Sequence, residues 1–294
     1  MDTAEMDAIA HLPCWSGRVD IAPLAGGITN RNYLVHDPGQ GRFVARIGAD
    51  RPIHGILRWN ERAATRAAAA AGIAPELLYA EAGILVSRFV EARTLEATTF
   101  ADPEVLFRAA RLIRRCHDEL PSHLRGPALM FWPFQVNRNY LARLAQTGHG
   151  FGATLARFAA VNAALEEGLG PVRIAFAHND LLPANFLDDG SRLWLIDWEY
   201  AGFDTPLFDL ANLAANAALG EAAEATLLAA WAGTDPSPAE RRGFLALKCA
   251  SALRETLWSA VSEQEAATAF DYAAYTGENQ LRFEAAWEAW RAAA

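Results

Sequence analysis

The stretch that decides the fold is AFAHNDLLPANFLDDGSRLWLIDWEYAG, residues 175–202. It contains two short apolar runs, NFLD and RLWLID, which are separated by Asp189-Gly190, a pair typical of a hairpin turn. Asn185 begins the first run and Asp197 ends the second, so a hairpin would bring both side chains to the same open end. An amide oxygen and a carboxylate suit Mg²⁺, which prefers oxygen ligands and keeps water positions that substrate phosphates can take.

Asp180 lies just before this hairpin, in a loop that Pro183 restrains. A carboxylate in that place can accept or orient the proton of an attacking hydroxyl group. Asp and Asn are also ordinary turn residues, so each position taken alone has a simpler structural explanation. The ordered set is more specific, because His-x-Asp at 178–180, then Asn185, then an Asp ending an apolar strand is the order of catalytic and metal-binding residues in protein kinases. The set predicts a phosphoryl-transfer site.

The composition favours a large core and a small substrate. The chain has 294 residues, of which 52% are hydrophobic, so it can form one large domain or two lobes around a cleft. Its formal net charge of -9 argues against a nucleic-acid groove and favours a cationic or neutral small substrate. Cys14, Cys116 and Cys249 are widely spaced and form no Cys-x-x-Cys pair, so we expect buried reduced thiols.

The N-terminal sequence predicts a cytoplasmic protein that has no membrane partner. MDTAEMDAIAHLPCW carries acidic residues where a secretory signal needs positive charge, and no run reaches the ~18 apolar residues that span a bilayer. All but one of the 26 basic residues are arginine, the exception being Lys248. No Gly-Lys-Ser/Thr sequence occurs, which excludes a Walker-type P-loop, and Schiff-base chemistry would depend on that single lysine.

The local patterns change character near residue 91. Before it, the strand-like runs RVDIAPL, NYLVH, RFVARIG, ELLYA and ILVSRFV are interrupted by one Ala-rich helical stretch, ILRWNERAATRAAAAAG. After it, helical patterns dominate apart from the catalytic hairpin. We therefore predict an α+β fold in which residues 1–91 form a small antiparallel sheet with one helix. Residues 92–294 would form a larger, mainly helical lobe with the catalytic loop and the acceptor pocket.

Taken together, these motifs resemble the choline/ethanolamine kinase branch of the aminoglycoside phosphotransferase-like, protein-kinase-like proteins. The matching stretches extend over nearly the whole chain and are LAGGITNRNYLV, FVARIG, NERAATRAAAAAGIAPELL, VSRFVEARTL, HNDLLPANFL, LIDWEYAG, PLFDLAN and LRETLWSAV. The resemblance implies a two-lobed kinase fold with ATP and Mg²⁺ as cofactors. It also implies that Asp180 is catalytic and that Asn185 and Asp197 bind the metal.

The same resemblance assigns the loop over the ATP phosphates. Gly26, Gly27, Thr29 and Asn30 match the turn between the first two strands, where glycine allows backbone N–H groups to approach an anion closely. Taken alone, Gly-Gly is also an ordinary hairpin turn. Arg46 matches the position of the protein-kinase lysine, and its planar fork can bind phosphate oxygens with two hydrogen bonds.

Two further nucleotide-side assignments follow from the resemblance. Glu61, on the Ala-rich helix, matches the acid that holds the basic residue in place, although it could also be an ordinary surface charge. Arg88, Phe89 and Val90 match the hinge between the lobes, where an adenine ring would bind backbone groups rather than side chains.

Residues behind the catalytic loop are expected to support it. In the family that the chain resembles, the residue at His178 usually braces the loop, so we do not assign it as a general base. Asp209 and Asn212, in PLFDLAN, are expected to be further braces.

The acceptor side is expected to combine aromatic rings with carboxylates. A trimethylammonium group has no N–H to donate, so aromatic faces recognise it, each contributing about 0.5–2 kcal/mol. The candidates in stretches that resemble the family's substrate wall are Glu199, Tyr200, Glu255, Trp258, Tyr272 and Tyr275. Glu199 could equally touch a second Mg²⁺. Trp258 could equally belong to the core, because Leu253 and Val261 share its helical spacing.

Two positions depart from the eukaryotic choline kinase pattern. That pattern has Gln two residues after the catalytic Asp and Glu four residues after the Asn of PLFDLAN, whereas this chain has Leu182 and Asn216. Both departures lie on the acceptor side, so the resemblance supports phosphotransferase activity better than it supports choline as the acceptor.

The sequence therefore predicts an ATP-dependent kinase that phosphorylates choline or a related amino alcohol or quaternary amine. One alternative keeps this chemistry with ethanolamine, thiamine or an aminoglycoside as the acceptor. Another is a catalytically silent nucleotide-binding module that regulates a partner. The formation of a homodimer is left open.

Overall fold

The computed structural model describes residues 3–25, 30–148, 150–265 and 270–293. Gly26, Gly27 and Thr29, which are predicted to cover the ATP phosphates, lie outside these described residues.

The described elements begin with a short helix, followed by three strands, a helix, two strands and then a mainly helical part that contains five further short strands. The helices are α1 (Thr3–Ala10), α2 (Arg58–Ala70), α3 (Pro103–His123), α4 (Pro133–Thr147), α5 (Thr154–Glu167), α6 (Pro206–Asn216), α7 (Glu221–Ala232), α8 (Pro238–Glu265) and α9 (Tyr272–Ala292). The strands are β1 (Asp20–Leu24), β2 (Arg31–Asp37), β3 (Gly41–Ile47), β4 (Leu77–Glu81), β5 (Ile84–Arg88), β6 (Arg93–Thr94), β7 (Ala175–Ala177), β8 (Phe186–Asp188), β9 (Leu193–Leu195) and β10 (Gly202–Asp204).

The N-terminal part is a five-stranded antiparallel sheet in the order β1-β2-β3-β5-β4. Each of the five predicted strand runs is therefore confirmed. Alternating residues of these strands, among them Val35, Phe43 and Val86, form a small core, because successive side chains point to opposite faces. Ile9 of α1 joins this core, although the sequence analysis did not predict that helix.

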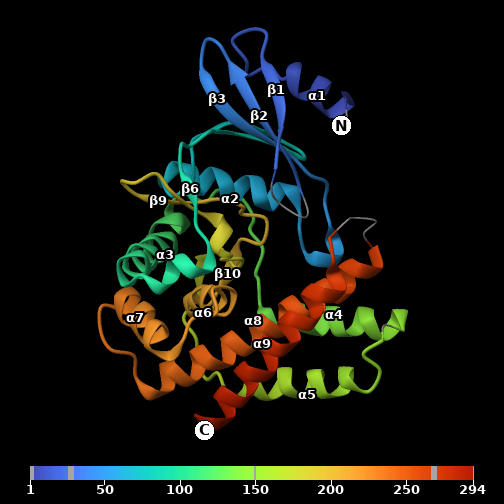
Figure 1. Cartoon of the computed structure of the whole chain (residues 1–294), viewed down its shortest axis with the longest axis vertical. Helices are drawn as coiled ribbons and strands as arrows, with labels where there is room; N and C mark the ends of the chain where they lie inside the picture. Colours follow the sequence, from blue (N-terminus) through green and yellow to red (C-terminus); the bar gives the residue numbers. More distant parts are fainter. Residues whose placement is uncertain (1–2, 26–29, 149, 266–269, 294) are drawn as a thin grey trace.

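Helix α2 connects this sheet to the helical part of the molecule (Figure 1). It is the predicted Ala-rich helix, and Ala64, Ala67 and Ala68 are buried in the main core. Alanine is the best helix former and has a small side chain, so α2 can approach both β4 and α3. The Asp50 carboxylate accepts a hydrogen bond from the backbone N–H of Arg58 (2.7 Å) and satisfies one of the free donors at the start of the helix.

The helical part also contains the predicted hairpin, which packs against α3. Strands β8 and β9 pair as the predicted hairpin and are joined by β6, while β7 and β10 form a second small antiparallel pair. Helix α8 packs against α4, α6 and α9 (Figure 1). Its middle turns are buried and include polar and charged residues such as Arg254 and Glu255.

The predicted α+β architecture, with a small antiparallel sheet followed by a larger helical body, is confirmed. The lobe boundary between residues 91 and 92 stays a prediction. Among the helices of the described residues, none has both the length and the apolar composition that crossing a bilayer requires. Cys116 and Cys249 are buried free thiols, as expected, whereas Cys14 is only half-buried.

Candidate active site

The catalytic loop follows β7, and Asn179, which precedes Asp180 in this loop, has a strained backbone conformation. Asn179 has a φ of 66°, in the left-handed region that Asn tolerates better than most residues. Its side-chain amide donates hydrogen bonds to the backbone carbonyls of Tyr200 (3.1 Å) and Gly202 (3.3 Å). Such conformations persist only where the surrounding contacts fix them, so the loop is held in one shape.

Helix α6 supplies the first of these contacts through Asp209. Its carboxylate accepts hydrogen bonds from the backbone N–H groups of His178 (3.0 Å) and Asn179 (2.7 Å), and from Nε2 of His117 (2.9 Å). Burial acts to raise the pKa of Asp209, but the hydrogen bond and charge of His117 outweigh burial, and the pKa is lowered. Asp209 therefore braces the loop, as expected.

Asn212, one turn further along α6, supplies the second contact. Its Oδ1 accepts a hydrogen bond from the backbone N–H of Leu181 (2.5 Å), and its Nδ2 donates to Ser251 on α8 (2.9 Å). The loop that carries Asp180 is thereby tied to two helices of the core.

His178 also braces the loop, because both of its ring nitrogens are occupied. Nε2 donates to the backbone carbonyl of Ile196 (2.9 Å), and Nδ1 accepts from the backbone N–H of Asp180 (3.3 Å). Its ring packs against Trp198 with 4.6 Å between the centroids. Burial lowers the pKa of His178 and favours the neutral ring that this bonding pattern requires. The geometry agrees with the expectation that His178 is not a general base.

The Asp180 carboxylate faces a residue that the sequence analysis did not single out. Nη1 of Arg254, on α8, lies 3.1 Å from Oδ1 of Asp180 and 2.9 Å from Oε1 of Glu255. Burial raises the pKa of Asp180, whereas the charge of Arg254 acts in the opposite direction. The sequence signal was present in LRETLW, but an arginine next to a glutamate in a helix does not by itself indicate burial.

The two predicted metal ligands emerge side by side. The amide nitrogen of Asn185 donates to the backbone carbonyl of Asp180 (2.8 Å), so its oxygen is the atom that can bind a cation. The backbone N–H of Ile196 donates to the Asn185 carbonyl (3.1 Å), which places Asp197 next to it. Asp197 has a φ of 68°, a second left-handed residue, and its side chain is 28% exposed.

The donor set around Asp197 fits a magnesium ion. Carboxylate oxygens of Glu61, Asp197 and Glu199 all lie within 4.8 Å of one another. Oxygen-only ligands of this type suit Mg²⁺, and Asn185 would add an amide oxygen. Glu199 is buried, and its carboxylate belongs to this cluster.

Two arginines neutralise these carboxylates in the structure. Arg46 forms ion pairs with Glu61 and, through Nη1, with Asp197 (2.5 Å), so the expected Arg46–Glu61 pair is present. Arg58, which the sequence analysis missed, is buried on α2, and its Nη1 lies 2.7 Å from Glu61 and 3.1 Å from Glu199. Arg46 of the N-terminal sheet and Arg58 of α2 thus form ion pairs with Asp197 and Glu199, which follow the hairpin of β8 and β9.

Asn30 marks where the predicted phosphate loop reaches this cluster. Its Nδ2 donates to Oε2 of Glu199 (2.9 Å), and its Oδ1 accepts from Nη2 of Arg58 (2.8 Å). The described end of that loop is therefore anchored beside the metal ligands.

Two backbone N–H groups of the predicted hinge already form hydrogen bonds to neighbouring backbone carbonyls. The backbone N–H of Arg88 donates to the carbonyl of Glu76 (2.8 Å), and that of Phe89 donates to the carbonyl of Arg42 (3.0 Å). The side chain of Arg88 pairs with Glu76 at the surface. An adenine ring would need other backbone groups of this stretch, and Val90 is the remaining residue of the three that we predicted.

The aromatic candidates for the acceptor wall gather on α8 and α9. The Trp258 ring lies 6.1 Å from that of Tyr272 and 6.2 Å from that of Tyr275. The Tyr275 hydroxyl donates to Oε2 of Glu255 (3.0 Å), so the wall is joined to the carboxylate. Trp258 is also part of the main core, yet its Nε1 is buried and has no hydrogen-bond partner among the described residues.

Tyr200 occupies a different place from the other aromatic candidates. Its ring stacks on the guanidinium of Arg254, 4.4 Å from the ring centroid to Cζ, and contacts Phe131 edge-on. It is buried behind Asp180 and supports Arg254 rather than joining the ring cluster around Trp258.

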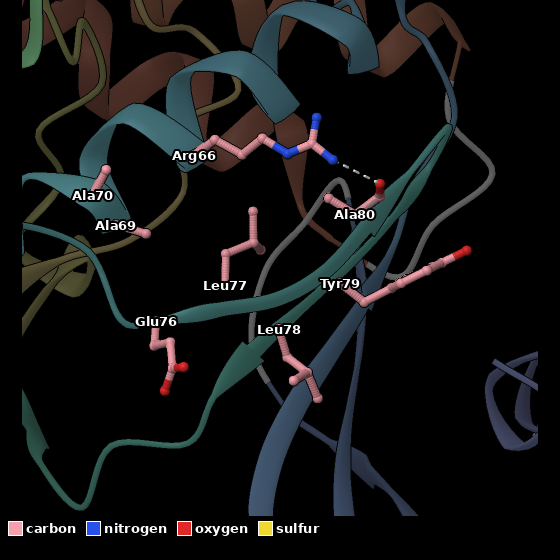
Figure 2. Close-up of a pocket in the computed structure, with 8 residues that line it drawn as sticks. All are labelled: Arg66, Ala69, Ala70, Glu76, Leu77, Leu78, Tyr79 and Ala80. Atoms are coloured by element: carbon pink, nitrogen blue, oxygen red, sulfur yellow. Dashed lines mark hydrogen bonds between the residues drawn. The ribbon is translucent and has the colours of Figure 1, made fainter. Parts of the chain in front are cut away.

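A cavity of about 320 Å³ lies between α2 and β4, away from these residues (Figure 2). It is lined by Arg66, Ala69, Ala70 and residues 76–80, and Arg66 donates to the Ala80 carbonyl at its edge (3.2 Å). None of these lining residues belongs to the catalytic loop, the carboxylate cluster or the aromatic wall. Glu76, which lines the cavity, also pairs with Arg88 of the predicted hinge, so the cavity borders that stretch.

Known proteins resemble this chain in sequence and in fold. A sequence model of the phosphotransferase enzyme family matches residues 20–244. Protein LicA of Haemophilus influenzae is 29% identical over 260 residues, which are 84% of this chain and 75% of LicA. The crystal structure of a choline/ethanolamine kinase family protein from Mesorhizobium loti is 30% identical, with a TM-score of 0.79 over 98% of this chain and 95% of that one. Choline kinase LicA from Streptococcus pneumoniae, at 24% identity, shares the fold, with a TM-score of 0.77 over 97% and 99% of the two chains.

Proposed function

The chain belongs to the phosphotransferase enzyme family, within its choline/ethanolamine kinase branch, and from this premise we propose that it transfers the γ-phosphate of ATP to the hydroxyl of choline or a related small amino alcohol. The observation that carries the proposal is the position of Asp180. Its carboxylate lies on a fixed loop, between the metal hairpin that follows it and the Arg254–Glu255 pair at the aromatic wall.

On the nucleotide side, the oxygens of Asn185 and Asp197 would hold Mg²⁺, with Glu61 and Glu199 close by. When bound, the ion would offset negative charge on the phosphates. Arg46 would move part of its hydrogen bonding from Asp197 to phosphate oxygens, while Glu61 keeps it in place.

On the acceptor side, Asp180 would orient the hydroxyl and accept its proton as the oxygen attacks the phosphorus in line. Holding the two reactants in this alignment supplies most of the catalysis, because little covalent chemistry is required of the protein.

The charge balance of the acceptor side favours a cation. Asp180 and Glu255 are two carboxylates that share one guanidinium, that of Arg254, so ionisation of both leaves one negative charge uncompensated by Arg254. Tyr275 adds an aromatic ring beside Glu255, and Trp258 packs against Tyr275 and Tyr272.

The aromatic rings next to Glu255 favour a quaternary ammonium group. Oε1 of Glu255 accepts from Arg254, and its Oε2 accepts from Tyr275, whose ring packs against Trp258. A trimethylammonium group has no N–H to donate, so aromatic faces and nearby negative charge are sufficient to bind it. Choline is therefore our first candidate, and ethanolamine, thiamine and an aminoglycoside follow it.

The test is an ADP-release assay on the purified chain with MgATP and, in turn, choline, ethanolamine, thiamine, homoserine and kanamycin, each compared with a reaction that lacks an acceptor. We expect the highest kcat/KM for choline. A highest value for kanamycin or thiamine would move the acceptor to another class. No release above the acceptor-free rate with any compound would contradict the kinase proposal and favour a silent nucleotide-binding module. A cytoplasmic location and a homodimer stay predictions.

A further inference from the structure

Arg254 is a fully buried cation at the centre of the site. It lies in the middle of α8, and its side chain is 1% exposed. Taking a guanidinium out of water costs several kcal/mol unless good ion pairs and hydrogen bonds offset that cost. An apolar side chain at this position would carry no such cost. The contacts of Arg254 must therefore stabilise its charge.

The contacts of Arg254 join the parts of the candidate active site. One nitrogen, Nη1, lies within hydrogen-bonding distance of Asp180 on the catalytic loop (3.1 Å) and Glu255 on the acceptor wall (2.9 Å). The plane of the guanidinium packs on the rings of Tyr200 (4.4 Å) and Phe131 (5.4 Å). Held by two rings and two carboxylates, the guanidinium has little freedom to rotate.

This arrangement selects one oxygen of Asp180 for the reaction. Oδ1 accepts a hydrogen bond from Arg254, whereas Oδ2 accepts none from the described residues, and the side chain of Asp180 is 12% exposed. Oδ2 is therefore the oxygen that can bind an acceptor hydroxyl without competing with Arg254. Because a carboxylate rotates about its Cβ–Cγ bond, a fixed partner on one oxygen also fixes where the other oxygen points.

We propose that Arg254 is a positioning residue, which holds Oδ2 of Asp180 toward the acceptor hydroxyl and links that orientation to Glu255 of the acceptor wall. The proposal rests on the proposed function, since it takes Asp180 as the group that receives the hydroxyl proton. Arg254 itself would touch neither ATP nor the acceptor.

The test is a double-mutant cycle on the full chain, with ADP release from MgATP measured at saturating choline. Arg254→Ala should lower kcat by about 10²-fold, the cost of misplacing a catalytic group, and leave the KM for ATP within about threefold. Arg254→Lys should recover part of this loss, because it restores the charge without the planar fork. Added guanidinium ion should accelerate Arg254→Ala, since it can occupy the space that the side chain leaves.

The decisive comparison is made in the Asp180→Asn background. Since Arg254 would act through Asp180, adding Arg254→Ala to Asp180→Asn should cost no more than about threefold, and guanidinium should give no rescue there. Losses that multiply in the double variant would overturn the proposal, as would an Arg254→Ala enzyme within about threefold of the wild-type rate.

Lys248→Met is the matched control. Lys248 lies on the same helix and forms an ion pair with Glu224, away from Asp180. The Lys248→Met substitution should lower the thermal midpoint and leave kcat nearly unchanged. If Arg254→Ala does not fold, Arg254→Lys and Arg254→Gln in the two backgrounds give the same cycle. If the wild-type chain phosphorylates no compound of the acceptor panel, the proposed function itself fails. If it does but the cycle is additive, only the role of Arg254 fails.

Discussion

Arg46 is the residue at which the nucleotide and metal sides of the site meet. It is paired with Glu61 on α2 and with Asp197 at the end of the hairpin. We predict that Arg46→Lys keeps part of the wild-type kcat/KM for ATP and that Arg46→Ala keeps much less, because lysine retains the charge but not the bidentate fork. Steady-state kinetics with varied MgATP measure the difference. Full activity in both variants would place Arg46 outside the nucleotide site.

Trp258 is the residue that most directly tests the choline assignment. Its ring lies among Tyr272, Tyr275 and His54. Trp258→Ala should raise the KM for choline about tenfold, or ~1.4 kcal/mol, through the loss of one cation–π face, and leave the KM for ATP unchanged. A thermal melt is the required control, because truncating a core Trp can cost ~3–5 kcal/mol of stability. A lowered midpoint with an unchanged choline KM would assign Trp258 to the core alone.

At the scale of residues, the sequence predicted the site residues that belong to an ordered motif. It did not predict the two buried arginines that pair with the site carboxylates. Asp180, Asn185 and Asp197 have a fixed order along the chain, and the structure brings them together. Arg58 and Arg254 carry no such order. A buried charge is recognisable only from the carboxylates around it, and those come from segments far away in the sequence.

The hairpin of β8 and β9 is the element that carries the predicted metal ligands. Asp197→Ala should abolish Mg²⁺-dependent turnover, and Asn185→Ala should weaken it, because a carboxylate holds a divalent ion more strongly than an amide does. The measurement is kcat/KM for ATP as a function of Mg²⁺ concentration, with EDTA as the reference. Turnover that is indifferent to EDTA would contradict the assignment of both ligands.

Helix α6 is the element that fixes the catalytic loop, through Asp209. Asp209→Asn should lower the free energy of unfolding by about 1–3 kcal/mol at neutral pH, since it weakens buried hydrogen bonds to His117 and to the loop backbone. Denaturant titration measures the difference.

The pH dependence of this effect follows from the lowered pKa of Asp209. A carboxyl group with a lowered pKa in the folded state contributes stability above its unfolded pKa, and this contribution is lost as the pH falls through the folded value. The difference between the wild type and Asp209→Asn should therefore persist down to about pH 4 and shrink only in stronger acid. A difference that vanishes near pH 6 would contradict this role of Asp209.

At the scale of elements, segments with a strong local sequence pattern were predicted correctly, whereas the short helix α1, which has a mixed pattern, was not. The five strands and α2 follow from the strand-like runs and from alanine content. The start of α3 at Pro103 is fixed by Asp102, whose side chain accepts from the Glu104 N–H (2.9 Å). Helix α1 was missed because it has only 8 residues and a mixed pattern, so its formation depends on Ile9 packing under the sheet.

At the scale of the whole molecule, the site exists only where the two parts of the chain meet. Arg46 and Arg58 come from the sheet and α2, whereas Asp197 and Glu199 come from the hairpin region. His54, which precedes α2, contacts Tyr140 on α4 and the ring of Trp258 on α8. The sequence predicted a small sheet followed by a larger helical part, and the resemblance implied a two-lobed kinase fold. The contacts between the two parts depend on tertiary packing that no local pattern encodes.

The measurement that tests the central claim most directly is ³¹P NMR of a reaction that contains the wild-type chain, MgATP and choline. The predicted result is a new phosphomonoester resonance that grows in step with ADP, and a rate at least about 10²-fold lower for Asp180→Asn, with ATP affinity within a few-fold of wild type. Growth of inorganic phosphate without a phosphomonoester, or an Asp180→Asn variant as fast as the wild type, would contradict it.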